Sequence, residues 1–317
     1  MKNLGIVIVA WNSADQIARC VQAALAVSEG PIVVVDNASS DQTLTSIPAH
    51  PRVEIVANQE NLGFAGGVNS GCRRLSTEYF LILNPDAELL GGLEDLVAAA
   101  SEGAAGGQLL DSQGSPQAGF QFRRFPTPTT LVWEVLGINR LWPTNSVNRR
   151  YRCADQNPGV EQSVDQPAGA FFCVRRDAFE TLGGFDESYW PVWFEDVDFC
   201  RRLTLRGYRI RYTPKARARH LGAQSIRKIL WSSKELAWYG SLLRYATSQF
   251  GWLSRRMVGL AVAAASVPRS VKGILNGHWK ANAFGVYLKV FALGLGVFLS
   301  GRVYERRMPL RKGSALQ

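Results

Sequence analysis

Short apolar runs alternate with segments of helical periodicity over residues 1–110. Apolar, β-branched runs of this kind predict buried strands, and the longer segments between them predict helices. Strands that alternate with helices form βαβ units, so the pattern predicts an α/β fold with a mostly parallel sheet and helices on both faces. The expected strands are 4–9, 32–35, 53–56 and 79–83, and the expected helices are 13–27, 64–75 and 92–101.

The pattern becomes irregular over residues 111–165, which are rich in Pro, Gly and Asn and contain a basic stretch. This composition predicts a long excursion or mobile loop rather than a separate domain. Regular structure resumes with a strand at 170–174, a helix at 195–207 and a strand at 208–212. Beyond about residue 225 the sequence changes to long helices rich in Trp, Leu and Arg.

Charge divides the chain in nearly the same place. Residues 1–200 hold 13 Lys and Arg against 24 Asp and Glu, whereas residues 201–317 hold 23 against 2, so the net charge of +10 conceals two opposite parts. A basic part of this kind suits a polyanion, either an anionic membrane or a nucleic acid. We therefore expect a domain of residues 1–225 and a helical, basic extension of residues 226–317.

Two apolar runs within the basic extension favour the membrane over nucleic acid. They cover residues 257–267 and 281–301, and Lys289 lies near the middle of the second. The second run is long enough to cross a bilayer of about 30 Å, but a central lysine costs about 2.5–3.5 kcal/mol there. With many Trp and Arg residues, these runs fit helices that lie in the interface of an anionic membrane. A spanning segment, packing in solution and a homo-oligomer interface are the alternatives.

Composition excludes several classes of protein. A chain of 317 residues, 46% of them hydrophobic, is long enough to bury a full core and is neither disordered nor fibrous. Its five cysteines are scattered without a CxxC pair, which argues against a structural zinc site and for a reducing compartment. The apolar run at residues 4–10 is too short for a signal peptide, so we expect a protein of the cytoplasm.

Polar residues follow three of the expected strands. Asn12, Asp36 and the triplet Asn84-Pro85-Asp86 come directly after strands, and ligands of parallel sheets bind outside the carboxyl ends of the strands. Asp86 beside another oxygen ligand suits a hard divalent cation, although Asn-Pro-Asp is equally typical of a plain turn. The stretch 58–71 has four glycines ahead of a helix but matches neither GxGxxG nor the P-loop, so it is weak support for phosphate binding.

Three carboxylates begin the helix that follows the aromatic segment 189–194. They are Glu195, Asp196 and Asp198, and carboxylates at a helix start often only complement the helix dipole. Aromatic neighbours, however, desolvate a carboxylate and raise its pKa, which suits a general base. His220 follows in a basic stretch and is a candidate metal ligand, although a lone histidine is more often structural.

Seven motifs occur in order along this part of the chain: VIVAWN, VVVDNASSD, NLGFAGGVN, LNPDAEL, GAFFCVRRDAF, GGFDE and WFEDVDFCRRL. Together they resemble the inverting family-2 glycosyltransferases of the GT-A fold, and most closely the bacterial rhamnosyltransferase-like branch. The resemblance covers residues 4 to about 225, roughly 70% of the chain.

The resemblance implies a donor site at the matching positions. The donor would be a nucleotide-diphosphate sugar. Asn12 and Asp36 would hold its base and ribose, and the glycine-rich loop would lie beside them. The loop positions are Asn61, Gly63 and Asn69.

The resemblance also implies a metal-dependent reaction. The turn that ends in Asp86 stands in the place of the family's DxD motif, with Asp86 and His220 as ligands of Mg²⁺ or Mn²⁺. Asn84 replaces the first Asp of that motif and is left to hydrogen-bond the ribose. Asp196 matches the catalytic base, and Glu195 beside it would orient the acceptor.

The implied activity is sugar transfer in cell-surface polysaccharide synthesis. Rhamnose from dTDP-rhamnose is our first choice, other dTDP-, UDP- or GDP-sugars are alternatives, and the acceptor is a saccharide or a polyprenyl-diphosphate-linked saccharide. With the basic extension, this predicts a peripheral protein on the cytoplasmic face of the inner membrane. A non-catalytic nucleotide-sugar-binding or scaffolding homologue is the alternative, because Asn84 departs from the motif. The long apolar runs and the acidic first part argue against a nucleic-acid partner.

Overall fold

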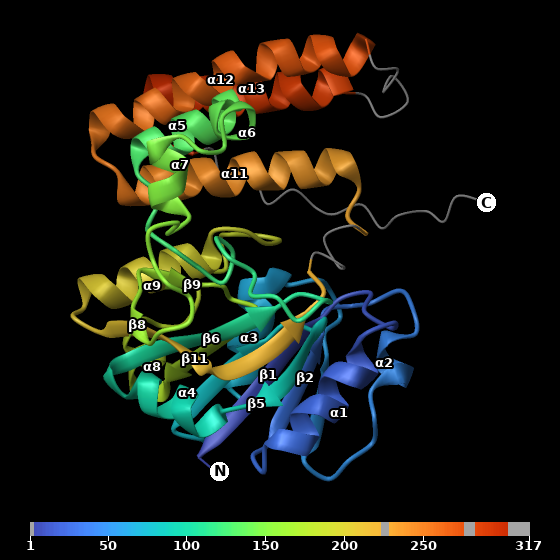
Figure 1. Ribbon diagram of the computed structural model, residues 1–317. Coiled ribbons are helices and arrows are strands. Elements are labelled where there is room, and N and C mark those ends of the chain that lie inside the picture. Colours follow the sequence, from blue (N-terminus) through green and yellow to red (C-terminus); the bar gives the residue numbers. More distant parts are fainter. Residues whose placement is uncertain (1–2, 223–227, 276–282, 304–317) are drawn as a thin grey trace.

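The computed structural model describes residues 3–222, 228–275 and 283–303. A sheet with helices on both faces forms the lower layer in Figure 1, and a layer of helices lies above it. The expected α/β fold is confirmed, and the helices of the C-terminal extension are present.

The first half of the sheet is parallel and consists of the four strands expected before residue 84. β1 (Leu4–Ala10) lies between β2 (Ile32–Asp36) and β4 (Tyr79–Leu83), and β3 (Val53–Ala57) is the edge strand beyond β2. All seven residues of β1 are buried, as expected for a strand covered on both faces. In register, Val7 lies opposite Val33 of β2 and Ile82 of β4.

The second half of the sheet is mixed. β10 (Phe171–Arg175) runs antiparallel to β4 and to β6 (Gly103–Leu110). β11 (Arg209–His220) runs parallel to β6 and antiparallel to the edge strand β5 (Ala87–Gly91). The short strands are β8 (Gln162–Ser163), which pairs with β11, and β7 (Phe122–Arg123) and β9 (Gln166–Pro167), which pair with each other.

Helices cover both faces of the sheet, and each face has its own core. The covering helices are α1 (Ile17–Val27), α3 (Gly63–Cys72), α4 (Leu93–Ala99), α8 (Arg176–Thr181) and α9 (Glu195–Leu205); α2 (Thr43–Ser46) and a 3-10 turn at Ala100–Glu102 are short. Ile6 of β1 packs with α1 and α4, whereas Val7 packs with α3, α8 and α9. This alternation is the two-residue period of a strand buried on both faces.

Several elements differ from expectation. β5 and β6 were not expected, and β11 continues to His220 instead of ending at Tyr212. The first five residues of β6, GAAGG, lack the β-branched and aromatic side chains on which strand prediction depends. A Cβ on Gly107 would lie 2.1 Å from Phe171 Cε1, so close packing excludes larger residues here. α1 begins at Ile17, four residues later than expected, because a turn precedes it.

The segment 111–165 was expected to be irregular, and that expectation is wrong for about a third of it, which is helical. It contains α5 (Pro128–Leu136), α6 (Ile138–Leu141) and α7 (Ser146–Tyr151). Thr127 caps α5 by accepting a hydrogen bond from Thr130 N at 3.1 Å, and Gly137, with φ of 79°, ends it. Asn145 caps α7 in the same way.

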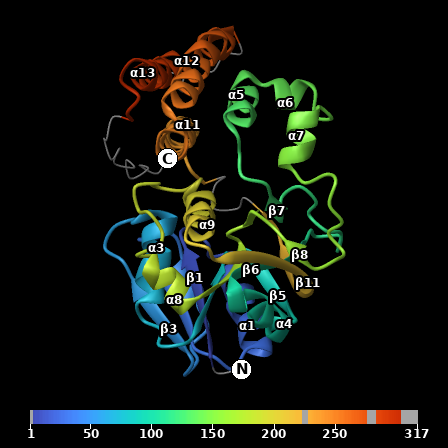
Figure 2. The same ribbon diagram turned by 90° about the vertical axis from the view of Figure 1, so that its left-hand side faces the viewer.

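The upper layer combines this segment with the C-terminal extension (Figures 1 and 2). The extension contributes α11 (Trp231–Gln249), α12 (Trp252–Leu275) and α13 (Ala283–Ser300). Leu131 of α5 shares one hydrophobic core with Leu242 of α11 and Val262 of α12. The segment 111–165 and the C-terminal extension thus build one core together, on the two sides of the expected boundary near residue 225. That boundary stays a prediction.

Within the described ranges, α13 is the one helix that is long and apolar enough to cross a membrane. Its mean hydropathy is 1.8, and a third of it is buried against the rest of the protein. It packs closely on α12, since a Cβ on Gly294 would lie 2.7 Å from the carbonyl oxygen of Gly259. The expected apolar run of residues 281–301 begins outside the described residues.

Candidate active site

A cavity of about 370 Å³ lies at the carboxyl ends of β1, β2 and β4, where the sheet meets the helical layer. Trp11, Asn37 and Asp86, which follow these strands, line one part of it. Glu195 and Asp196 line another part, and residues of α5 and α11 line a third. The structure therefore brings together the polar strand ends and the carboxylates of α9, which lie far apart in the sequence.

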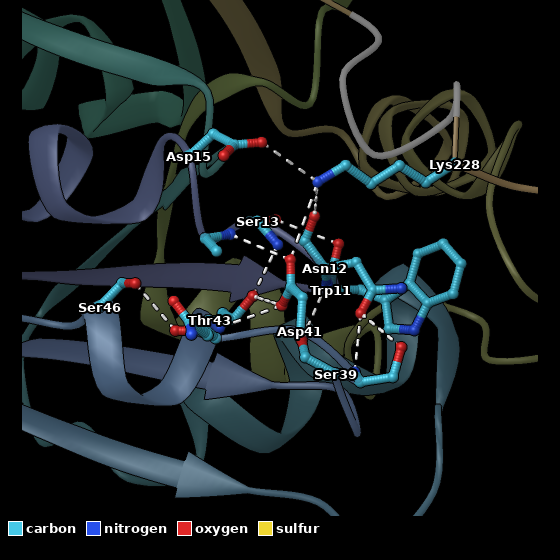
Figure 3. Close-up of polar contacts among 12 residues, drawn as sticks. Trp11, Asn12, Ser13, Asp15, Ser39, Asp41, Thr43, Ser46 and Lys228 are labelled. Carbon is cyan, nitrogen blue, oxygen red and sulfur yellow. Dashed lines mark hydrogen bonds and ion pairs between the residues drawn. The ribbon is translucent and has the colours of Figure 1, made fainter. Parts of the chain in front are cut away.

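Asn12 holds the loops after β1 and β2 together (Figure 3). Its backbone φ is 49°, its side-chain oxygen accepts a hydrogen bond from Ser40 N at 2.8 Å, and its carbonyl accepts one from Lys228 Nζ at 2.6 Å. Lys228 also lies 3.8 Å from Asp41 Oδ2, so the segment after β11 is tied to both loops. The neighbouring Trp11, rather than Asn12, lines the cavity.

Asp36 is buried at the end of β2, and its carboxylate is used within its own loop. Its oxygens accept hydrogen bonds from the backbone N–H of Ser39, at 3.1 Å, and from the Ser39 hydroxyl. The next residue, Asn37, lines the cavity and donates through Nδ2 to the carbonyl of Gly63 at 2.8 Å. The end of β2 is thereby joined to the glycine-rich loop.

The glycine-rich loop supports the aromatic segment 189–194. Gly63 has φ of 77°, and a Cβ there would lie 2.8 Å from Trp190 Cδ1, so a side chain does not fit. Asn61 lines the cavity, and its carbonyl accepts a hydrogen bond from Trp190 Nε1 at 2.9 Å. Asn69 instead exchanges two hydrogen bonds of 2.9 Å with the backbone of Phe185 and is not among the residues that line the cavity. Of the three predicted loop residues, the structure brings Asn61 to the cavity.

His220 ends β11 beside Asp86. Its Nε2 lies 3.4 Å from Asp86 Oδ1, and both residues are buried. Gln117 donates through Nε2 to the His220 carbonyl at 2.7 Å, so its Oε1, 3.1 Å from Nδ1, accepts the ring proton. The Nε2 lone pair therefore faces Asp86, and Nε2 has no hydrogen-bond partner among the described residues. Phe120 stacks on the imidazole with ring centroids 5.4 Å apart.

The Asp86–His220 pair fits a divalent cation. A buried imidazole nitrogen without a partner costs free energy, which a bound cation removes. No group of three or more His, Cys, Asp or Glu side chains surrounds a common point in the part of the chain that the structure describes. Two protein ligands leave positions for phosphate oxygens and water, which is how Mg²⁺ is commonly held beside a substrate diphosphate. Asn84 lines the cavity nearby and offers an amide.

Asp196 faces the cavity from the first turn of α9 and is partly exposed there. Its Oδ1 accepts a hydrogen bond from Val197 N at 2.8 Å, and its Oδ2 accepts one from Gly169 N at 3.2 Å. Burial raises the pKa of Asp196, and these two hydrogen bonds and the charge of Arg123 moderate the rise. A carboxylate with a raised pKa at a cavity wall can take a proton from a bound hydroxyl.

Glu195 is buried beside Asp196. Burial and the charge of Asp196 raise the pKa of Glu195 well above its usual range. Its Oε2 is buried without a hydrogen-bond partner among the described residues. Trp193 and Phe194 directly before it have φ of 83° and 68°, values that are uncommon for non-glycine residues and that cluster at functional sites. Asp198, by contrast, is bound within α9 by Arg202, at 2.7 Å, and supports the helix.

Four residues at this site were not singled out from the sequence. Phe120, Arg123 and Trp238 line the cavity, and Gln117 orients the imidazole of His220. Three of them lie in the segment 111–165, and the periodicity of that segment does not show its path across the carboxyl ends of the strands. The basic residues of this segment were the feature of the sequence that could have pointed to the site.

The first 183 residues carry a family signature. Residues 5–183 match the model of the family described as glycosyl transferase family 2, and residues 149–224 match that of the N-terminal domain of galactosyltransferase. A relative from Mycobacterium tuberculosis, N-acetylglucosaminyl-diphospho-decaprenol L-rhamnosyltransferase, is 30% identical over 243 residues, which cover 70% of this chain and 77% of the relative. Rhamnosyltransferase WbbL of Escherichia coli is 29% identical over 140 residues, 44% of this chain and 46% of WbbL.

Solved structures show the same fold. The mannosyltransferase PcManGT from Pyrobaculum calidifontis, in complex with GDP-Man and Mn²⁺, superposes with a TM-score of 0.51 over 95% of this chain and 88% of that one, at 14% identity. GalNAc-T7 with UDP, GalNAc and Mn²⁺ superposes with a TM-score of 0.50 over 77% and 51% of the two chains, also at 14% identity. At such low identity the likeness concerns the fold alone.

Proposed function

The chain belongs to glycosyl transferase family 2, and we propose that it is an inverting rhamnosyltransferase that moves rhamnose from dTDP-rhamnose to a polyprenyl-diphosphate-linked saccharide. The single observation that carries the chemistry is the cavity lined by both Asp196, a carboxylate of raised pKa, and Asp86, which is paired with the buried His220 behind it. The names of two relatives, both rhamnosyltransferases, support the sugar. UDP- and GDP-sugars are the alternative donors.

Asp196 acts as the general base in this proposal. The acceptor hydroxyl forms a bond to the anomeric carbon while the bond from that carbon to the diphosphate oxygen breaks, and the hydroxyl proton passes to Asp196. A raised pKa suits this step because an effective base has a pKa near the working pH. Asp86 and His220 would hold Mg²⁺ or Mn²⁺, which neutralises charge on the departing diphosphate. Glu195 keeps its proton more readily and orients the acceptor.

The donor nucleotide occupies the part of the cavity lined by Trp11 and Asn37. Asn84 and Asn61 offer amides there, and Asn84 hydrogen-bonds the ribose. Asn12 and Asp36 act by holding the loops that shape this part, since their side chains bind Ser40 and Ser39. Gly63 and Asn69 do not touch the donor in this proposal: Gly63 supports the aromatic segment 189–194, and Asn69 fixes the backbone of Phe185 ahead of that segment.

The outer helices hold the protein on the cytoplasmic face of an anionic membrane, as a peripheral protein. Leu253, Met257 and Leu260 are exposed and recur at helical spacing along α12, and Phe284 and Leu288 do so along α13. In Figure 1 these two helices form the layer farthest from the sheet. Residues 201–317 hold 23 basic and 2 acidic residues, and this positive charge suits anionic headgroups.

Product analysis tests the proposed reaction. The protein is incubated with dTDP-rhamnose, Mn²⁺ and an N-acetylglucosaminyl-diphospho-lipid, and the anomeric configuration of the product is read by NMR. We expect an inverted linkage and loss of transfer in excess EDTA. Asp196→Asn should lower kcat by about 10²–10⁴ while donor binding is kept, because the base is lost and the shape is not.

Asp95→Asn is the matched control, since Asp95 lies on α4 and pairs with the exposed Lys215 away from the cavity. Its kcat should equal that of the unmodified protein. A retained configuration would exclude single displacement, and full transfer in EDTA would exclude the metal. Near-normal kcat in Asp196→Asn would move the base elsewhere, with Glu195 next in line.

A further inference from the structure

The cavity extends beyond the residues that the donor needs, towards the helical layer. We propose that Arg123 and Arg152, together with the apolar wall between α5 and α11, bind the diphosphate and the first isoprenoid units of the acceptor. This inference rests on the proposed function, because it assigns the acceptor of that reaction to one part of the same cavity. Both arginines and the apolar wall line the cavity.

Arg123 is held with its guanidinium available. Its Nε donates to the carbonyl of Gly119 at 2.9 Å, and the guanidinium lies 5.6 Å from the ring centroids of both Phe120 and Tyr151. Among the described residues no carboxylate forms an ion pair with it, although its charge acts on Asp196. A guanidinium fixed by aromatic faces and left unpaired is suited to bidentate binding of a phosphate.

Arg152 comes to the same place from the end of α7. Its Nε donates to Asn148 Oδ1 at 3.1 Å, and its side chain packs against Gly119, where an added Cβ would lie 3.2 Å from Arg152 Cβ. The turn at Gly119 has φ of 71° and therefore favours glycine. This turn lets the two arginines line one wall, and two guanidiniums match the charge of a diphosphate.

The position of Asp196 decides which diphosphate this wall receives. In single displacement the acceptor hydroxyl lies on the side of the base, and the leaving diphosphate lies opposite. Arg123 of β7 pairs with Gln166 of β9, three residues before Gly169, whose N–H binds Asp196. Asp86 and His220, by contrast, serve the donor. The arginine wall is therefore on the acceptor side, where a second diphosphate needs cations of its own.

The apolar wall continues from the arginines into the helical layer. Leu131 of α5 and Trp238 and Leu242 of α11 line it, and both helices lie above the sheet and above α9 (Figure 2). Glu134 of α5 also lines the cavity. Its carboxylate is held by a hydrogen bond from Asn139 Nδ2 at 3.0 Å. Isoprenoid units gain free energy by leaving water for such a wall, and the chain beyond them is directed to the outer helices.

Farnesyl diphosphate carries both chemical groups without a sugar, so it is the probe. It is titrated into the full-length protein in EDTA, which removes any contribution of a metal-bound diphosphate, and binding is followed by calorimetry. We expect Arg123→Gln with Arg152→Gln to weaken binding by about 10-fold or more, as the loss of charge-assisted hydrogen bonds does. Arg149→Gln is the matched control, because Arg149 lies on α7 in a separate hollow and should leave binding unchanged.

Two further measurements separate the parts of the proposal. Inorganic diphosphate should bind at least 10-fold more weakly than farnesyl diphosphate, and Trp238→Leu should weaken farnesyl diphosphate alone. If Arg149→Gln weakens farnesyl diphosphate binding as much as the double variant does, the effect is a general attraction of the anionic probe to positive charge. If the two probes bind equally well, there is no isoprenoid site.

Binding of dTDP with Mn²⁺, measured in parallel, should not change in any of these variants. A failure of dTDP binding would count against the proposed function, whereas a failure confined to farnesyl diphosphate would count against this subsite.

Discussion

Glu195 links the active site to stability. Burial raises its pKa above the unfolded value of 4.5, so the folded protein holds this proton more tightly than the unfolded chain does. Its contribution to stability is then fully present below pH 4.5 and is lost as pH rises through the folded pKa. The amide in Glu195→Gln cannot ionise, so this variant does not lose that stability as the pH rises. We predict that the melting temperature of Glu195→Gln exceeds that of the unmodified protein at pH 8 and that the difference shrinks towards pH 4.5.

Thermal unfolding over pH 4.5–8 measures this effect. Glu94→Gln is the control, because Glu94 lies in the exposed part of α4 and its melting curve should follow that of the unmodified protein. A Glu195→Gln variant that is less stable at pH 8 would show that the ionised carboxylate has a stabilising partner.

Gln117 orients the imidazole of the Asp86–His220 pair with its side chain. It accepts the Nδ1 proton of His220 and so leaves the Nε2 lone pair facing Asp86, where the proposed cation would bind. Residues that orient a metal-binding histidine typically change metal affinity by about 10–100-fold. We predict that Gln117→Leu weakens Mn²⁺ binding by this factor, and that Gln117→Glu, which still accepts the proton, retains most of it. Calorimetric titration of Mn²⁺ checks both, and unchanged affinity in Gln117→Leu would contradict the assigned orientation.

Elements with a clear periodicity were predictable, and the reasons for the failures are local. The buried strands β1, β2 and β4 were placed within one residue because covered strands are continuous apolar runs. β11 was cut short although its end, ARARH, alternates: Ala216, Ala218 and His220 are buried, and Arg217 and Arg219 are exposed. That alternation already places His220 inside the protein. β6 carried no such signal, since close packing requires small residues there.

The α12–α13 pair shows how an element depends on one small residue. A Cβ on Gly294 would lie 2.6 Å from Ala263 N and 2.7 Å from the Gly259 carbonyl, whereas one on Gly296 meets nothing within 4 Å. Gly294→Ala should therefore separate the helices and cost about 1–3 kcal/mol of unfolding free energy. Gly296→Ala is the matched control and should stabilise the same helix by up to about 1 kcal/mol. Equal effects of the two changes in urea unfolding would contradict the close packing.

At the scale of the whole molecule, the site lies between two layers. The sheet supplies, through its strand termini, the end that we propose for the donor, and these termini were found from the sequence because parallel strands end at a common edge. The end that we propose for the acceptor is lined by α5 and α11, which belong to segments separated by about 100 residues and meet through one hydrophobic core. A local sequence pattern cannot predict this contact between distant segments, so Arg123 and Trp238 were not expected at the cavity.

The outer face of α12 and α13 gives the last prediction. Leu253 and Leu288 are 62% and 55% exposed, and transfer of such side chains out of water contributes about 1.5–3 kcal/mol each. The full-length protein should float with vesicles that contain anionic lipid, and Leu253→Glu with Leu288→Glu should lower binding by about 10-fold or more. High salt should release the unmodified protein only partly, because salt screens the basic residues and leaves the apolar contact.

Leu205→Glu is the matched control for that experiment. Leu205 is equally exposed, at 66%, but it ends α9 in the sheet layer, so its replacement should leave vesicle binding unchanged. A truncation near residue 225 is a poorer test, because it would strip α11 from the core that contains Leu131 and Tyr189. If the double variant binds vesicles as well as the unmodified protein does but loses mass in light scattering, the exposed stripes join copies of the chain instead of meeting lipid.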